Sequence, residues 1–93
     1  MIEKNWQGLP LDPSSLQEEI ARLEAAVDAF AAAMKSKLAA KALEGRTGWD
    51  DPRVRDSIYT AMLAHAAGVP MAAGQEVDVA NFAMMLWRMR TGA

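Results

Sequence analysis

Residues 13–44 read PSSLQEEIARLEAAVDAFAAAMKSKLAAKALE and contain no glycine, and no proline after the first position. Large apolar side chains recur along this stretch at spacings of 4-3-4-3-4, which place them on one face of a helix. They are Leu16, Ile20, Leu23, Val27, Phe30 and Met34. The stretch therefore predicts one long helix of about 30 residues, roughly 45 Å at 1.5 Å per residue.

The residues in front of this stretch predict where the helix begins. Asp12 before Pro13 is a common pairing of N-cap and first helical residue, and Ser15 followed by Glu18 offers a capping box. The helix should begin within a few residues of Pro13. Residues 1–12 are punctuated by glycine and proline, and we expect them to form an irregular N-terminal arm.

Two shorter helices are expected in the rest of the chain. The Asp51-Pro52 pair predicts a second helix over about 52–67, and a glycine-bounded connection then leads to a third over about 75–90. The third helix is apolar nearly all round, which is typical of a central helix. The sequence thus predicts an all-α fold, with residues 13–93 as a single helical domain.

The long helix also predicts self-association. Two short neighbours cannot cover an apolar stripe of this length, and a chain of 93 residues buries only about 60–65% of its unfolded surface. We expect the stripe from Leu16 to Met34 to form the interface of a homo-oligomer, a dimer or larger, which completes a helical bundle. Alanines beside the stripe would permit close approach of the helices.

Composition limits the functional classes. The chain has no cysteine, so it has no disulfides and no thiolate metal site. No apolar run is long enough to span a bilayer, and we expect a soluble, cytoplasmic protein without a membrane partner. A net charge of −2 makes binding to duplex DNA an unfavoured function.

The expected third helix carries polar residues on one face, in the stretch QEVDVANFAMMLW over residues 75–87. Gln75, Asp78 and Asn81 are each one turn apart. Oxygen-bearing side chains in this arrangement could help to hold Mg²⁺. Alternatively, Asp78 could stabilise the N-terminal turn of the helix and Asn81 could bind a loop. The spacing is compatible with both interpretations. In the first of them, Asp78 is the candidate metal ligand.

Cations and an indole form a second candidate site, near the end of the long helix. Lys37 and Lys41 are one turn apart, and Arg46 and Trp49 follow in the next loop. Cations beside an indole could hold a phosphate and stack a base. The structural alternative is that the lysines complement the helix dipole and Trp49 fills the core.

The segment DVANFAMM over residues 78–85, with the lysines near Lys37 and the Gly-Trp loop, resembles the MazG-like all-α NTP pyrophosphatases and related small phage and prophage proteins. The resemblance covers about residues 34–87. It implies a Mg²⁺-dependent hydrolase whose metals are held by one Glu-x-x-Glu and one Glu-x-x-Asp pair. Asp78 matches the family's Asp, but Gln75 stands where the family has Glu, and the segment 52–65 contains only Asp56 as an acid.

Incomplete acidic pairs favour binding over catalysis. The resemblance then implies a small phage or prophage protein, acting in the host cytoplasm, that binds a nucleotide-type anion or a host protein and so counters a host process or defence. The expected binding residues are Lys37, Lys41, Arg46, Trp49, Asp78 and Asn81, with no cofactor and no catalytic residue. One alternative is a reduced pyrophosphatase with a Mg²⁺ site rebuilt around Asp78, and the other is a purely structural helical oligomer.

Overall fold

A computed structural model describes residue 6, residue 8, residue 12 and the ranges 15–68 and 71–93 of the chain. These residues form the helices α1 (Leu16–Leu43), α2 (Arg55–Ala66) and α3 (Gln75–Thr91), with a short 3₁₀ helix, η2 (Pro52–Val54), in front of α2. The described part of the chain contains no strand, so the predicted all-α fold is confirmed.

The predicted helix boundaries are close to those observed. The long helix was expected over 13–44 and is observed over Leu16–Leu43, while residues 13–14 lie outside the described residues. The second was expected over 52–67; its first turn is instead the 3₁₀ helix η2, and α2 ends at Ala66. The third was expected over 75–90 and ends one residue later.

The starts of the helices differ in their local interactions. The Asp51 carboxylate accepts a hydrogen bond of 2.9 Å from the backbone N–H of Arg53, so the predicted Asp51 cap is present. The expected Ser15 capping box is wrong, because the Ser15 side chain accepts no capping hydrogen bond; its hydroxyl donates to the Asp12 carbonyl oxygen. Gly74 has φ of +87° directly before α3, a conformation that glycine adopts without the steric cost of a Cβ atom.

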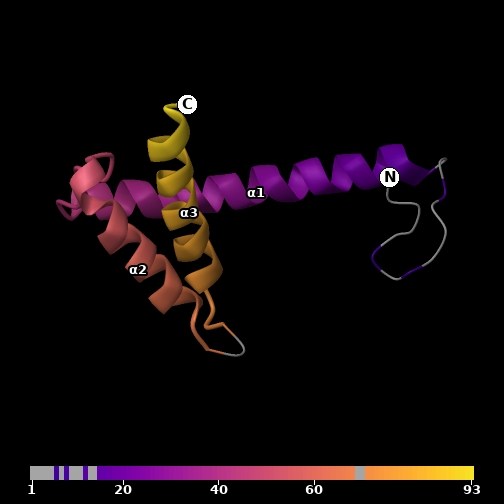
Figure 1. The fold of residues 1–93 in the computed structure, drawn as a ribbon. Coiled ribbons are helices and arrows are strands. Elements are labelled where there is room, and N and C mark those ends of the chain that lie inside the picture. The colour runs from indigo at the N-terminus through magenta and orange to yellow at the C-terminus, as the bar shows by residue number, and fades with distance from the viewer. Residues whose placement is uncertain (1–5, 7, 9–11, 13–14, 69–70) are drawn as a thin grey trace.

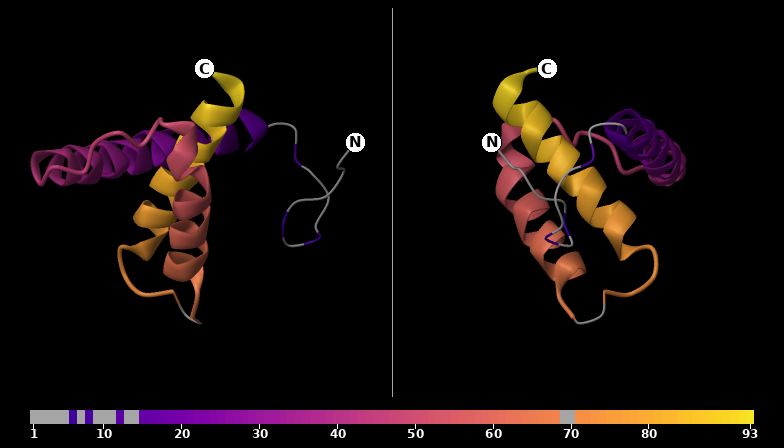
Figure 2. Two further views of the ribbon diagram at one scale, coloured as in Figure 1. Left: turned by 60° about the vertical axis from the view of Figure 1, so that its left-hand side comes forward. Right: turned by 90° about the vertical axis from the view of Figure 1, so that its right-hand side faces the viewer.

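The helices are arranged as a long rod with a helical pair at one end. Figure 1 shows α2 and α3 at the C-terminal end of α1, with α3 crossing α1. Helix α3 packs against both other helices, as its apolar composition predicted. The N-terminal half of α1 extends beyond this crossing, and no other described helix runs alongside it in Figure 1; the right-hand view of Figure 2 shows α1 nearly end-on, beside the pair.

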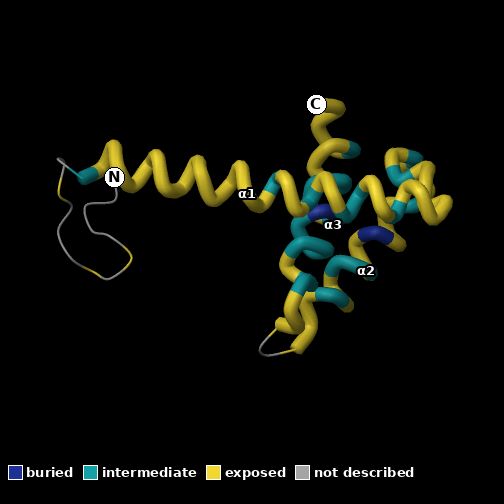
Figure 3. The backbone as a smooth tube through the Cα atoms, turned by 180° about the vertical axis from the view of Figure 1, so that it is seen from behind, coloured by how far each residue is buried: buried dark blue, intermediate teal, exposed yellow. Residues whose placement is uncertain are grey.

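The core of the single chain is small. Among the described residues only Ile58 in α2 and Asn81 in α3 are buried, at 8% and 5% exposed respectively. Figure 3 shows the buried positions confined to α2 and α3, while the N-terminal half of α1 is exposed on all sides. No helix of the described chain is both long enough and apolar enough to cross a membrane. Most of the predicted arm over 1–12 lies outside the described residues.

Candidate functional site

The two residues that the sequence offered for anion and metal binding contact each other. Lys37 on α1 places its Nζ atom 2.8 Å from Oδ1 of Asp78 on α3. The side chain of Asp78 is only 15% exposed and that of Lys37 is 36% exposed. A lysine ammonium at this distance compensates the carboxylate charge and occupies one of its oxygens. The pair therefore joins α1 to α3 as well as forming part of the candidate site.

Asp78 also faces helix α2. Its Oδ2 atom lies 3.7 Å from Nδ1 of His65, and the same imidazole nitrogen is hydrogen-bonded to the side-chain oxygen of Gln75. The His65 ring lies 5.2 Å from the Phe82 ring, between centroids. The predicted polar face of α3 is thus turned toward the other helices, where it forms a partly buried network.

Asn81 is the most buried polar residue described. Its Nδ2 donates a hydrogen bond of 3.4 Å to the carbonyl oxygen of Met34 in α1. A carbonyl oxygen cannot donate, so this contact fixes the orientation of the amide and leaves Oδ1 on its other side. Oδ1 has no hydrogen-bond partner among the residues that the structure describes. Asn81 therefore contacts the long helix, whereas the sequence offered a loop as its structural partner.

The acids do not converge into a metal centre in the described part of the chain. There, no three Asp, Glu or His side chains lie close enough together to hold a metal ion. Asp78 is paired with Lys37. Asp56, the one acid of the segment 52–65, is exposed, and its Oδ1 atom lies 3.6 Å from Nε of Arg55. The magnesium site stays a prediction from the resemblance.

The cation and indole group is only partly assembled. Lys41 lies 3.6 Å from the carboxylate of Glu44, so a second of the expected anion-binding cations is paired with an acid. Arg46 is exposed just beyond the end of α1, where its backbone N–H donates to the Lys41 carbonyl. Trp49 is partly buried in the following loop. Of the three expected cations Lys37, Lys41 and Arg46, only Arg46 forms no ion pair with a described residue.

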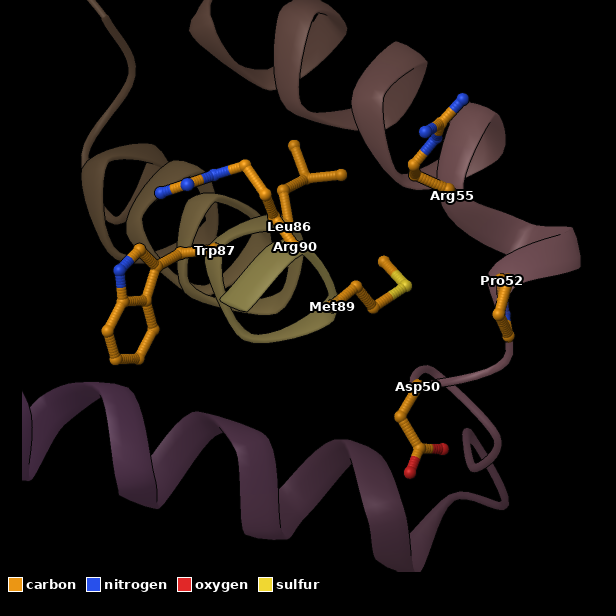
Figure 4. A pocket seen from close by; sticks show the side chains of 7 residues that line it. All are labelled: Asp50, Pro52, Arg55, Leu86, Trp87, Met89 and Arg90. Carbon is orange, nitrogen blue, oxygen red and sulfur yellow. The ribbon is translucent and has the colours of Figure 1, made fainter. Parts of the chain in front are cut away.

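A groove elsewhere presents a similar set of side chains. It has a volume of about 530 Å³ and lies between the loop before η2, the start of α2 and the end of α3. Figure 4 shows Met89 extending from α3 toward the loop and Trp87 on the α1 side of α3. We call it the α3 groove; its lining residues are Asp50, Pro52, Arg55, Leu86, Trp87, Met89 and Arg90.

The sequence interpretation missed the α3 groove. It treated the third helix, which contains Trp87, as a central helix, but Trp87 is 51% exposed. One signal was available: Trp87 and Arg90 are three residues apart, which places an indole and a guanidinium on one side of a helix. Arg55 comes from a different helix, so only the tertiary structure brings it to the groove.

Comparisons with protein-family models, with curated proteins and with solved structures found no match to this chain. The resemblance to the MazG-like pyrophosphatases remains an expectation based on residues 34–87. A proposal for the function therefore depends on the geometry of the described residues.

Proposed function

We propose that the protein is a small helical binding protein whose α3 groove takes a nucleotide-type anion. The observation that carries the proposal is the presence of Trp87, Arg55 and Arg90 around one groove of about 530 Å³. Pockets for small ligands are typically about 300–1000 Å³ and combine apolar walls with a few polar groups. The volume and lining of the groove are therefore suited to a ligand of nucleotide size.

The chemistry of the groove favours a ligand with a flat ring and a negative charge. The half-exposed indole of Trp87 offers a face on which a base can stack, and such stacking contributes about 1–3 kcal/mol per base. Leu86 and Met89 add apolar lining to the groove. Arg90 forms no ion pair with the described residues and Arg55 is paired only with the exposed Asp56, so neither guanidinium group is neutralised by a buried acid.

The α3 groove is a better candidate than the cluster expected from the sequence. Lys37 and Lys41 are each held by an acid, and an anion would have to compete with Asp78 and Glu44 for them. The groove contains one acid, Asp50, on its loop side. A host protein remains the alternative ligand, and we favour the nucleotide-type anion because the groove has the size of a small-molecule site.

Fluorescence of a variant with Trp87 as its only tryptophan tests the proposal. With Trp6→Phe and Trp49→Phe in place, the emission reports on the groove alone. We expect quenching on titration with mono-, di- or cyclic nucleotides, and no quenching by nucleosides at the same concentration. Isothermal calorimetry on the unmodified chain should give the same affinity for the nucleotide.

Matched substitutions locate the site. Arg90→Ala should weaken nucleotide binding about tenfold, since a charge-assisted hydrogen bond is worth about 1.5–3 kcal/mol. Arg46→Ala, which removes another exposed guanidinium from the expected cluster, should leave the affinity unchanged. The proposal is wrong if no nucleotide gives heat or quenching, and the site is misplaced if Arg46→Ala has the larger effect.

A further inference from the structure

The N-terminal half of α1 has an apolar face that no other described helix covers. Every residue from Leu16 to Phe30 is exposed. The apolar stripe within this segment retains large exposed fractions: Leu16 39%, Ile20 46%, Leu23 56%, Val27 65% and Phe30 37%. Met34, the next member of the stripe, is partly covered, because α3 crosses α1 at this point.

We propose that this face binds the same face of a second copy of the chain, with the two α1 helices antiparallel. In this pairing Leu16 lies opposite Met34 of the second copy, Ile20 opposite Phe30, and Leu23 opposite Val27. The two-fold axis passes between Leu23 and Val27. The homodimer so formed is independent of any ligand in the α3 groove.

The spacing of the stripe is self-complementary. The six apolar positions from Leu16 to Met34 follow the order 4-3-4-3-4, which reads the same in both directions. When a second α1 is turned end to end, each apolar position therefore meets another, as a two-fold interface requires.

Charge decides between the two directions of pairing. Residues 16–29 carry four acids and one arginine, whereas residues 30–43 carry three lysines and no acid. A parallel pair in register would set Glu19 of each copy near Glu24 of the other, on both sides of the stripe. The antiparallel pair sets Glu19 at the level of the partner's alanine at 31, one turn from Lys35, and leaves the two Glu24 residues near the two-fold axis as its single close pair of acids. Like charges side by side are destabilising, so the antiparallel direction is favoured.

The proposed partner helix fits the length of α1 that α3 leaves open. It would begin at Leu16 opposite Met34, whose carbonyl oxygen accepts the hydrogen bond from Asn81. The salt bridge from Lys37 to Asp78 lies just beyond. The second copy would thus cover α1 up to the position where α3 takes over, and the α2 and α3 pairs would sit at opposite ends of the dimer (Figure 1).

The exposed area also favours association. The chain exposes 7482 Å², whereas a compact monomer of this mass exposes about 5300 Å². A stable protein interface buries about 800 Å² per partner. The surplus is larger than this requirement, and the only buried apolar residue described in the single chain is Ile58.

Sedimentation equilibrium on a concentration series tests the dimer. From about 1 µM to about 200 µM, we expect the mass to approach that of two chains. Val27→Glu, which places a charge in the stripe, should raise the dissociation constant at least about tenfold. Ala25→Glu adds the same charge on the opposite face of α1 and should leave association unchanged. A single-chain mass throughout, or equal effects of the two substitutions, would overturn the proposal.

Cross-linking tests the direction and does not depend on the folding of the Val27→Glu variant. The chain has no cysteine, so single introduced thiols give no background. We expect a thiol cross-linker shorter than about 10 Å to join Ile20→Cys to Phe30→Cys in an equilibrated mixture. Each variant alone should stay unlinked, because its two thiols would be about 15 Å apart along the helix axis. Cross-linking of either variant alone would contradict the antiparallel pair. The absence of cross-linking in the mixture and in both single variants would contradict it as well.

Discussion

Lys37 and Asp78 form a salt bridge of 2.8 Å between Nζ and Oδ1 that joins the long helix α1 to α3. The second carboxylate oxygen of Asp78 faces His65 of α2 at 3.7 Å. One carboxylate thus contacts both other helices in a chain where only Ile58 and Asn81, among the described residues, are buried. A polar contact of this kind contributes a larger share of the stability in such a small core than it would in a large one.

Removing the Asp78 charge should lower stability. We expect Asp78→Asn to reduce the free energy of unfolding by about 1–2 kcal/mol, between the values for exposed and buried ion pairs. Urea unfolding followed by circular dichroism measures the change. A double-mutant cycle with Lys37→Met should show coupling, whereas the more exposed Lys41 and Glu44 pair should show about 0–0.5 kcal/mol. Equal coupling in the two pairs would mean that Asp78 has no special structural role.

Asn81→Asp should be more destabilising than Asn81→Ala at neutral pH. The aspartate loses the N–H that Asn81 donates to the Met34 carbonyl and puts a charge at a position that is 5% exposed. We expect Asn81→Ala to cost about 1–2 kcal/mol and Asn81→Asp at least about 3 kcal/mol. Urea midpoints at pH 7 compare the two variants. A smaller cost for the aspartate would show that the site around Oδ1 is open to water.

Ile58 should be the most sensitive apolar position in α2. Because its side chain is 8% exposed, Ile58→Ala should lower the free energy of unfolding by about 2–4 kcal/mol. Leu63 on the same helix is 51% exposed, and Leu63→Ala is the matched control with an expected cost below about 1 kcal/mol. Thermal unfolding of both variants, at one protein concentration, checks the difference.

Hydrogen bonds from the side chain and backbone of Arg53 lower the pKa of the Asp51 carboxyl from its ordinary value of 3.8. Because the folded-state pKa is depressed, the ionised cap stabilises the start of η2 above pH 3.8, and this contribution is lost as the pH falls through the folded-state value. An NMR titration of the carboxyl carbon should show the shift. Arg53→Ala should raise the pKa of Asp51 toward its ordinary value, and an unchanged pKa would contradict the assigned cause.

Incubation with Mg²⁺ and a panel of nucleoside triphosphates should release no pyrophosphate above the buffer background. The reason lies in the residues present: Asp78 is paired with Lys37, Gln75 binds His65, and the remaining acids on the described chain do not converge. Gln75→Glu, which restores the acid implied by the resemblance, should also be inactive. Release of pyrophosphate by the unmodified protein would favour the reduced pyrophosphatase.

The fold class and the three helices follow from local patterns in the sequence. The apolar stripe of residues 16–34 repeats with a helical period, and Asp51 before Pro52 marks the start of the next helical segment. These signals depend on residues within one or two helical turns, so they can be recognised without knowing which other helices pack against the segment. The Ser15 capping box was wrong: Ser15 does precede the helix, but its hydroxyl donates to the Asp12 carbonyl oxygen and accepts no hydrogen bond from the first turn.

The sequence predicted the candidate site less completely than it predicted the fold. Asp78 and Asn81 were recognised as unusual polar residues in an apolar helix, but their partners, Lys37 and the Met34 carbonyl, lie far away in the sequence. Lys37 was assigned to an anion site because a lysine near a helix end gives no indication of which acid it will meet. The α3 groove was missed because Arg55 and Arg90 come from different helices.

Helical periodicity, capping residues and the absence of cysteine are properties of the chain read in order, and they were enough to establish an all-α protein with one long amphipathic helix. The angle at which α3 crosses α1 depends on side chains that meet across helices. That crossing pairs Lys37 with Asp78, buries Asn81, and leaves the stripe from Leu16 to Phe30 exposed. Contacts between distant segments have no signature in a single sequence, because they depend on which helix faces pack together in three dimensions.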